Sequence, residues 1–439
     1  MGQALARLIL YAGIIAFVVV IASILGPSSG NWVHEAGKCF ALAGFSILVL
    51  QFFLASRVRW IERAFGLDIL IRFHKHMAVF ATFLVLLHPV LLAASEGNWN
   101  LIIGWDLPWY IWVGKAALVV VIVSVLLSLY QSLLHLKFET WRRLHNVGGV
   151  AIVAFAFTHS WVAGGDLDPI PMKALWIAGL VLLVMAYLGH RVFGPLRRKR
   201  HPYRVVGVHP EAEDVWTLRL APPEGEDVPF YLPGQFHFIT LYRGRNLPVE
   251  EHHWTISSPP TETQYVSSTI KAVGDFTSTI GETREGDRAA VQGPFGRFSY
   301  ALHPEERDLV FIAGGIGITP LMSMLRHMRD SKDDRSVLLL YANRFENQIL
   351  FREELANMEN GSRPSLEVAH VLSRPGEEWS GEIGHVDREK ITRFCGRSLE
   401  QKVFYVCGPQ GMREAVVVSL KDLGVRDPRI RVEIFSFLD

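Results

Sequence analysis

The chain has 439 residues, a formal net charge of +1 and half of its residues hydrophobic. A net charge this close to zero gives no basic footprint for nucleic-acid binding. The three cysteines, Cys39, Cys395 and Cys407, are far apart in the sequence. They supply neither a disulfide framework nor the four thiolates of an iron–sulfur cluster. The length allows two or three domains.

Apolar residues are concentrated in the first part of the chain, in runs long enough to cross a bilayer core about 30 Å thick. The predicted spans are residues 5–25, 35–55, 73–95, 108–130, 144–163 and 172–193. The first run, "LARLILYAGIIAFVVVIASILG", is longer than the apolar core of a typical signal peptide, and further spans follow it. We therefore interpret it as a retained membrane anchor, and the protein as an integral membrane protein embedded in the lipid bilayer.

Basic residues predict the orientation of these spans. The segments after spans two, four and six carry Arg57, Arg59, Arg63 and Arg72, then Lys137, Arg142 and Arg143, then Arg191 and "RRKR" at 197–200. The alternate segments, "GPSSGNWVHEAG", "EGNWNLIIGWDLP" and "GGDLDPIP", contain no lysine or arginine. The positive-inside rule then predicts that both termini are cytoplasmic.

Spans three and five each carry two histidines 14 positions apart, His74 with His88 and His145 with His159. Fourteen helical steps come about 40° short of four turns, so each pair shares one helix face over about 21 Å. In the predicted topology both spans run outward, which places the histidines at two matched depths. A ligand that accepts two axial imidazoles between helices is haem. With both axial positions filled, outer-sphere electron transfer is the expected chemistry.

Two other interpretations of these histidines stay open. They could be four unrelated polar residues bonded to nearby carbonyls, or a proton relay in a transporter. His76 lies on the opposite side of its helix from His74, so we expect it at the interface. Lys115, about two turns into span four, could neutralise a haem propionate or simply extend to the membrane surface.

From about residue 201 the pattern changes to short alternating strands, which predict an antiparallel barrel of about 100 residues. From about residue 305, strands alternate with helices, as in "DLVFIAGG" followed by "TPLMSMLRHM". That alternation predicts a doubly wound parallel sheet. The predicted fold is therefore a six-span helical membrane bundle (1–195) followed by an α+β reductase module, with a β-barrel domain (196–302) and an α/β nucleotide-binding domain (303–439).

The second of two neighbouring motifs, "HHWTISSPP" (252–260) and "KAVGDFTSTIGE" (271–282), has features of a phosphate site. Gly274 permits close approach, and Thr277 is expected to cap a short helix whose N–H groups face a pyrophosphate. Lys271 would add positive charge. The alternative for either motif alone is an ordinary hairpin followed by a capped helix.

A glycine turn opens a helix at "GGIGITP" (314–320), directly after the strand "LVFIA". Gly314, Gly315 and Gly317 form the turn, and Thr319 and Pro320 fall in the first helical turn. A strand before and a helix after give such a loop the context of a dinucleotide site. A further motif, "YVCGP" (405–409), contains Cys407, Gly408 and Pro409.

Together these motifs resemble the ferredoxin-NADP reductase superfamily, in the form used by prokaryotic NADPH oxidases and ferric reductases, and the paired histidines resemble the transmembrane domain of that family. The resemblance implies a flavin site at His252, Trp254, Thr255 and Ser257. In it Thr255 bonds the isoalloxazine edge and Trp254 lines the flavin, while His253 replaces the usual proline. It also implies a bacterial plasma-membrane location.

The same resemblance implies roles in the nucleotide site. Cys407 would lie beside the nicotinamide, Glu433 near the hydride path, and Phe437 or Phe435 over the flavin. Arg344 and Arg374 match positions where NADPH-using relatives bind the 2′-phosphate, so NADPH is favoured over NADH.

The resemblance implies a route from NADPH through FAD and two b-type haems to an acceptor at the outer face, most simply oxygen, which would give superoxide. A ferric chelate and a redox partner protein are the alternatives, although no obligate protein partner is evident. Animal oxidases of the family place a histidine of the oxygen pocket one turn beyond the outer ligand, where this chain has Leu92, and this difference weakens the case for oxygen. Five acidic residues are expected near the outer face: Glu35, Glu96, Asp106, Asp166 and Asp168. They would suit a cationic acceptor, or they could simply be solvated loop residues.

Overall fold

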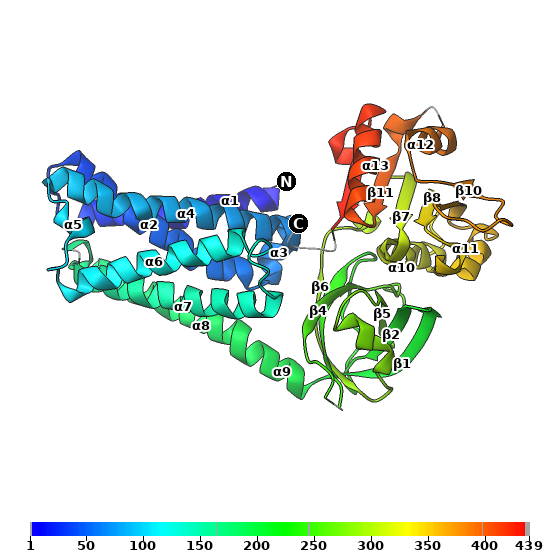
Figure 1. Cartoon of the computed structure of the whole chain (residues 1–439), viewed down its shortest axis with the longest axis horizontal. Helices are drawn as coiled ribbons and strands as arrows, with labels where there is room; N and C mark the ends of the chain where they lie inside the picture. The colour runs from blue at the N-terminus through cyan, green and yellow to red at the C-terminus, as the bar shows by residue number, and fades with distance from the viewer. Residues whose placement is uncertain (1, 164, 245, 397, 435–439) are drawn as a thin grey trace. The chain divides into compact units, whose positions relative to one another are not determined.

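The computed structural model describes residues 2–163, 165–244, 246–396 and 398–434. The chain divides into two compact units, a helical unit (residues 1–193) and an α/β unit (residues 194–439). Figure 1 shows the helices of the first unit in blue to green and the strands of the second in green to red.

The helical unit contains the six predicted spans. They are α1 (Gly2–Leu25), α2 (Trp32–Ala55), α4 (Leu67–Glu96), α6 (Trp109–Leu129), α7 (Phe138–Ala163) and α8 (Ile170–Leu188), which a π-helix (Gly189–Phe193) continues. Each is long and apolar enough to cross a membrane. Large apolar side chains such as Phe17, Phe83 and Met185 are more than half exposed, as expected for helices whose outer faces contact lipid.

Two short helices precede α4 and α6, namely α3 (Arg59–Phe65) and α5 (Asn100–Ile103). The sequence prediction placed Arg72, Arg142 and Arg143 in connecting segments. In the structure they lie in the first two turns of α4 and α7, because both helices begin about six residues before the apolar run.

The closest helix pairs are α2 with α4 and α6 with α7. Glycines make these approaches possible. A Cβ on Gly44 of α2 would lie 2.6 Å from Val85 Cγ1 of α4, and one on Gly148 of α7 would lie 2.6 Å from Ser124 Oγ of α6. Small residues at helix crossings are characteristic of packing inside membranes, where close backbone approach replaces the hydrophobic driving force.

The α/β unit opens with α9 (Gly194–Arg200) and an antiparallel sheet. Its strands are β1 (Tyr203–Ala212), β2 (Val215–Ala221), β3 (Phe236–Tyr242), β4 (Glu251–Thr255), β5 (Val266–Lys271) and β6 (Arg288–Phe295), in the order β4-β3-β6-β1-β2-β5. The sheet curls so that its two end strands meet, because Ser257, just after β4, donates its backbone N–H to Ser267 of β5. The predicted antiparallel barrel is confirmed.

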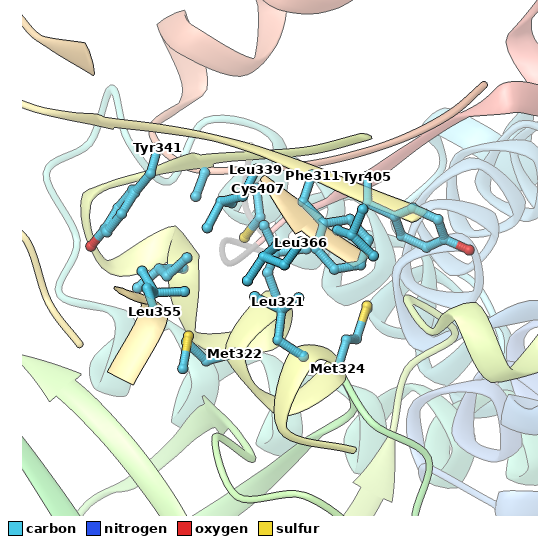
Figure 2. Close-up of a cluster of buried hydrophobic side chains, with 14 of the residues drawn as sticks. Phe311, Leu321, Met322, Met324, Leu339, Tyr341, Leu355, Leu366, Tyr405 and Cys407 are labelled. Carbon is cyan, nitrogen blue, oxygen red and sulfur yellow. The ribbon is translucent and has the colours of Figure 1, made fainter. Parts of the chain in front are cut away.

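A second sheet follows, with all strands parallel in the order β10-β9-β8-β7-β11-β12. The strands are β7 (Asp308–Gly314), β8 (Ser336–Asn343), β9 (Ser365–Leu372), β10 (Glu382–Ile383), β11 (Val403–Cys407) and β12 (Ile430–Glu433), and the helices are α10 (Ile318–Asp330), α11 (Arg352–Glu359), α12 (Arg388–Cys395) and α13 (Gln410–Asp422). Separate apolar clusters cover the two faces, one with α10 and α11 (Figure 2) and the other with α12 and α13. This confirms the predicted doubly wound domain.

Candidate functional site

The four histidines of α4 and α7 form two pairs. The ring centres of His74 and His145 lie 6.1 Å apart, and those of His88 and His159 lie 6.5 Å apart. Because the matched residues pair at both levels, α4 and α7 run parallel, as the sequence predicted. His76 lies off this face, exposed, with its Nδ1 2.7 Å from the Arg72 carbonyl.

These separations are those of two imidazoles on opposite sides of one metal ion. An imidazole nitrogen lies about 2.0–2.1 Å from a bound transition metal and about 1.2 Å from its own ring centre, so two ring centres across one metal stand about 6.4 Å apart. The backbones of α4 and α7 stay further apart than those of the closely packed pairs α2–α4 and α6–α7. A planar group held between the imidazoles therefore fits this part of the bundle.

The pair farther from residue 193, which we call the distal pair, has its free nitrogens fixed by hydrogen bonds. His88 Nδ1 lies 3.0 Å from the Gly37 carbonyl and His159 Nδ1 lies 2.8 Å from the Tyr110 carbonyl. A carbonyl can only accept, so each Nδ1 carries the proton and each Nε2 keeps its lone pair. This is the arrangement in which metal-binding histidines are usually oriented.

In the other pair, which we call the proximal pair, one serine fixes the tautomer of His145. Ser128 Oγ donates its only proton to the Ser124 carbonyl at 2.8 Å and accepts from Trp141 Nε1 at 3.2 Å. His145 Nδ1, 3.3 Å from the same oxygen, must therefore be the donor. Its Nε2 lone pair is then free to bind a metal.

At the distal level a glycine makes room for His159. A Cβ on Gly114 of α6 would lie 2.7 Å from His159 Nδ1, so only glycine lets the imidazole pack there. Pro89, inside α4 directly after His88, has no N–H to continue the helical ladder and so frees one carbonyl a turn earlier. Leu92 packs against Gly37, whose Cβ would lie 3.3 Å from its Cδ2.

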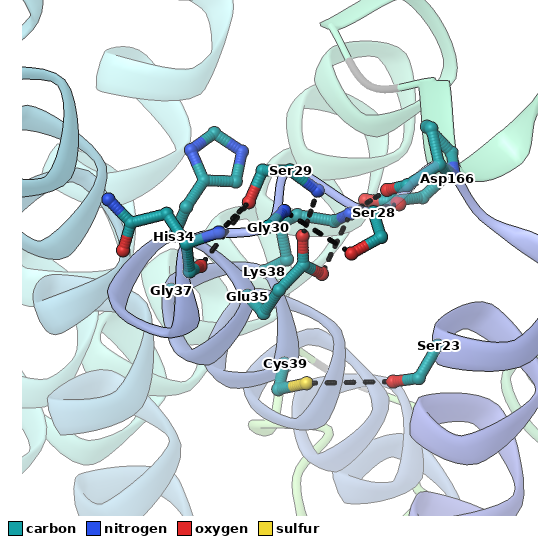
Figure 3. Close-up of polar contacts among 12 residues, drawn as sticks. Ser23, Ser28, Ser29, Gly30, His34, Glu35, Gly37, Lys38, Cys39 and Asp166 are labelled. Atoms are coloured by element: carbon teal, nitrogen blue, oxygen red, sulfur yellow. Dashed lines mark hydrogen bonds and ion pairs between the residues drawn. The ribbon is translucent and has the colours of Figure 1, made fainter.

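Two of the acids predicted near the outer face, Glu35 and Asp166, share one lysine (Figure 3). Lys38 Nζ lies 2.7 Å from Asp166 Oδ1 and 3.1 Å from Glu35 Oε2, and it also donates to the Pro27 carbonyl. Farther along the surface, Asp168 pairs with Lys173 and Glu96 with His34, whereas Asp106 is exposed.

Lys115, whose role the sequence left open between a haem propionate and the membrane surface, binds backbone carbonyls next to α5. Its Nζ donates to the carbonyls of Ile102 and Gly104 at 2.8 and 3.2 Å, and it lies 4.7 Å from the centre of the Trp112 ring. The lysine thus caps the end of α5 and holds that loop against α6.

The motif at residues 252–260, which resembles a flavin-binding signature and which we call the flavin-like motif, lies on β4 and the turn after it. His252 and Trp254 stack on one face of the strand with ring centres 5.6 Å apart, and His252 also contacts Phe276 at 4.2 Å. His253 faces the other side, against Phe236 and Phe238, so this replacement of proline is a packing residue. Thr255, Ser257 and Ser258 are buried at the end of the strand.

The neighbouring motif at residues 271–282 differs from the prediction in two details. Thr277 does not cap the helix from its N-cap position: the helix is a 3₁₀ turn (Thr277–Glu282), and Thr277 Oγ1 accepts from the N–H groups of Val273 and Gly274, both at 2.9 Å. Lys271 Nζ lies 3.3 Å from Asp214 Oδ2, so its charge is partly neutralised. Gly274 lies in open space, as close approach requires.

Sequence reasoning missed two residues beside this motif. The guanidinium of Arg243, just after β3, is buried, donates to the Thr279 carbonyl at 2.8 Å and lies 4.8 Å from the Phe276 ring centre. His237 is buried inside the barrel with Nε2 2.7 Å from Ser268 Oγ, which donates to the Thr255 carbonyl. The position of Arg243 directly before Gly244 was the one feature of the sequence that could have indicated its role. The sequence of β3 has no comparable feature that would single out His237.

The glycine turn and the "YVCGP" motif meet at the carboxyl ends of β7 and β11. After β7 the chain adds β8, β9 and β10 on one side of it, and then returns to add β11 and β12 on the other side. The gap between β7 and β11 is therefore a topological switch point, the place where open α/β sheets bind ligands. A Cβ on Gly317 would lie 2.4 Å from the Cys407 carbonyl oxygen, and one on Gly408 would lie 3.0 Å from Gly314 Cα. Gly315 has φ +54°, which favours glycine.

The remaining residues of this motif lie near the switch point. Thr319 and Pro320 are buried in the first turn of α10, and Pro409 directly precedes α13. Cys407 pairs in register with Glu433 of β12. Its side chain is fully buried in the apolar cluster under the sheet, where burial raises the pKa of the thiol well above its usual value. Phe435 and Phe437 lie outside the described residues.

Arg344 and Arg374 follow the adjacent strands β8 and β9 and are brought together, because the Arg374 N–H donates to the Arg344 carbonyl at 2.9 Å. Both side chains are exposed. At the carboxyl edge of the sheet they are placed where a phosphate on the ribose could be bound.

Comparison with known proteins assigns both units. Residues 40–156 match the family described as ferric reductase like transmembrane component, and residues 311–417 match the oxidoreductase NAD-binding domain. The chain is 26% identical over 267 residues to plasma membrane-associated coenzyme Q6 reductase PGA3 of Saccharomyces cerevisiae, covering 58% of this chain and 82% of that protein. It is 34% identical over 174 residues to cytochrome b5 reductase 4 of Rattus norvegicus, covering 39% of this chain.

The chain spans only 33% of that rat protein. Among solved structures, the cytochrome b5 reductase domain of Ulva prolifera nitrate reductase has a TM-score of 0.48 and 21% identity, covering 53% of this chain and 97% of that one. The first family match contains His74, His88 and His145, and the second contains the glycine turn and the "YVCGP" motif. The chain therefore joins a ferric-reductase-like transmembrane domain to an oxidoreductase NAD-binding domain, and is a membrane-embedded NAD(P)H-dependent oxidoreductase.

Proposed function

We propose that the protein carries electrons across a membrane from NADPH, through FAD and two b-type haems, to oxygen at the distal end of the helical unit. The proximal pair His74–His145 holds one haem and the distal pair His88–His159 holds the other. Each NADPH supplies two electrons as a hydride and releases one proton. Two oxygen molecules accept one electron each, which gives two superoxide ions.

The observation that carries this proposal is the pairing of the four histidines, at 6.1 and 6.5 Å between ring centres. A proton relay does not require two matched separations that fit a metal between imidazoles. Nor does it require that His88, His145 and His159 all turn Nδ1 toward an acceptor and so keep Nε2 available.

Bound FAD would convert a two-electron donor into single electrons, and bound haem would carry those electrons one at a time. The chain's own residues bind and orient. The glycine turn at 315–317 and the start of α10 would hold the dinucleotide pyrophosphate. Arg344 and Arg374 would favour a 2′-phosphate and hence NADPH. Trp254 and the buried Thr255–Ser258 segment would hold the flavin, and Arg243, which lies against Phe276, would add positive charge there.

We propose oxygen as the acceptor on the resemblance to NADPH oxidases. At the distal surface Lys38 lies between Glu35 and Asp166, and Lys173 pairs with Asp168, whereas Asp106 is exposed. A ferric chelate is the alternative acceptor.

The haem assignment is tested by replacing each histidine with alanine in the detergent-purified full chain. His74→Ala and His88→Ala should each lose one of the two haems, seen as haem bound per chain and as loss of one component in a redox titration. His76→Ala, two residues from His74 but exposed, should keep both. If His74→Ala and His76→Ala bind haem equally, the proposed ligands are wrong.

The acceptor is tested by reducing the protein with NADPH without oxygen, mixing it rapidly with aerated buffer and following the haem bands. Reoxidation at least as fast as steady-state NADPH consumption supports oxygen. Slow reoxidation by oxygen with fast reoxidation by a ferric chelate would transfer the function to metal reduction. Slow reoxidation by both would point to a partner protein.

A further inference from the structure

Helix α10 connects the two nucleotide-binding regions of the α/β unit. Its first turn follows the glycine turn at the switch point of the parallel sheet. Its flank contacts the segment 257–261, which continues the flavin-like motif of β4. Residues 323, 326 and 330 lie on this flank, at the spacing of one helix face. The helix therefore contacts both the region where the nicotinamide is expected and the region where the flavin is expected.

Backbone carbonyls of the 257–261 segment accept hydrogen bonds from this flank. Ser323 Oγ donates to the Ser258 carbonyl at 2.7 Å, and Arg326 Nη1 donates to the Ser257 carbonyl at 2.7 Å. Thr261 Oγ1 donates to Asp330 at the far end of the helix. The Ser258 carbonyl also accepts from Tyr231, so the segment is fixed from both sides.

Arg326 is itself held rigidly. Its Nε and Nη2 donate to the two carboxylate oxygens of Glu354 in α11, at 2.9 and 2.6 Å, and its guanidinium carbon lies 4.7 Å from the Phe351 ring centre. The side chains of Arg326 and Glu354 are 16% and 29% exposed, so solvent competes little for this bidentate pair. Burial opposes the charge on Glu354, but the bonds from Arg326 outweigh it and lower the pKa of the carboxyl group.

We propose that Arg326 is a positioning residue that sets the separation between the nicotinamide and the flavin, by tying α10 to the carbonyl of Ser257. Arginine suits this task because its planar fork reaches a carboxylate with two donors and a carbonyl with a third, which lysine cannot do. The inference rests on the proposed function, since it needs a hydride to pass between the two groups. A displacement of about 1 Å between reacting atoms can cost about 100-fold in rate.

The test compares Arg326→Gln with Arg329→Gln in the purified full chain. Arg329 lies one turn on along α10 and also contacts Glu354, at 3.3 Å, but it reaches the 257–261 segment only indirectly, through Asp330, to which its Nε donates at 2.9 Å. Flavin reduction by NADPH without oxygen, measured by rapid mixing at several NADPH concentrations, separates the limiting rate from the apparent dissociation constant. Arg326→Gln should lower the limiting rate at least about 10-fold with the dissociation constant nearly unchanged. Arg329→Gln should resemble the unaltered protein.

Two further measurements distinguish positioning from general destabilisation. Backbone hydrogen exchange in peptides covering 254–262 should accelerate in Arg326→Gln and not in Arg329→Gln, a readout that does not depend on turnover. Arg326→Lys keeps the charge but loses the fork, so its limiting rate should lie between those of Gln and Arg. If Arg326→Gln does not fold, Ser323→Ala, which removes one bond to the same segment, should show the same pattern with a smaller loss.

Equal limiting rates in Arg326→Gln and Arg329→Gln would overturn the inference, as would a change confined to the dissociation constant. Failure of NADPH to reduce a flavin in the unaltered protein is a different result. It would contradict the proposed function itself and not the role of Arg326.

Discussion

At the scale of single residues, buried polar side chains in this protein have their protonation states fixed by their neighbours. His237 shows this inside the barrel. Ser268 Oγ donates to the Thr255 carbonyl, so it can only accept from His237 Nε2. The imidazole is thereby a neutral donor that supports the backbone of the flavin-like motif. Burial lowers the pKa of His237 to about 3.

This shift predicts an acid-sensitive α/β unit. At pH above about 6.5 the imidazole is neutral in both folded and unfolded chains, and its full contribution to stability is present. As the pH falls from about 6.5 toward 3, the unfolded chain binds a proton that the folded one does not, which lowers the unfolding free energy by up to about 1.4 kcal/mol per pH unit. His237→Gln should flatten the fall of the calorimetric unfolding temperature between pH 7 and 5. His209→Gln, at an exposed position, is the control, and parallel profiles would contradict the assignment.

Coenzyme choice is also decided by individual side chains. Replacing Arg344 and Arg374 together by glutamine should lower kcat/KM for NADPH by about 100-fold or more, because charged hydrogen bonds to a phosphate contribute roughly 1.5–3 kcal/mol each. The value for NADH should change little. Steady-state kinetics with both coenzymes decide the matter, with Arg388→Gln, also exposed, as a charge-matched control. An equal loss with both coenzymes would show that the arginines do not read the 2′-phosphate.

At the scale of elements, glycine positions decide how closely helices approach the histidines. Gly114→Ala would place a methyl group 2.7 Å from His159 Nδ1, so the ring must move and lose its bond to the Tyr110 carbonyl. Loss of such a bond typically costs 10- to 100-fold in metal affinity, so the distal haem should be lost preferentially on dilution. Gly179→Ala, where the new methyl group meets open space, should keep both haems. Equal haem retention in the two variants would refute this role for Gly114.

The sequence predicted those elements whose periodicity is local and strong. The 14-residue spacing determines which helix face His74 and His88 share, whatever surrounds the helix, and the alternation after residue 305 determines a doubly wound sheet. The acceptors Gly37, Tyr110 and Ser128 could not be predicted, since each lies on another helix and depends on how the helices pack. Only the capping role of Thr277 was predicted wrongly, because its hydroxyl can accept either from the helix or from the turn before it, and the local sequence does not decide between the two.

At the scale of the whole molecule, the distribution of basic residues still predicts the orientation of the helical unit. The arginines found in the first turns of α4 and α7 lie at the same end of the helical unit as Arg191, which donates to Asn146 of α7. A fluorescent-protein fusion at either terminus should therefore be bright, and an alkaline phosphatase fusion at the same site inactive, in bacterial cells. A phosphatase fusion in the 97–100 loop should be active. Reversed activities would invert the proposed direction of electron flow.

The vertical stacking of the two histidine pairs has a consequence for the energetics of the membrane. A hydride leaves its proton behind when its electrons move on, so in the proposed orientation each turnover separates charge. The step between the pairs covers about 21 Å of a core about 30 Å thick, so roughly two thirds of the transmembrane voltage acts on it. A voltage of 100 mV amounts to about 2.3 kcal/mol per charge crossing the whole membrane. A negative interior therefore drives the electrons outward, and their passage depolarises the membrane until a proton or another cation follows.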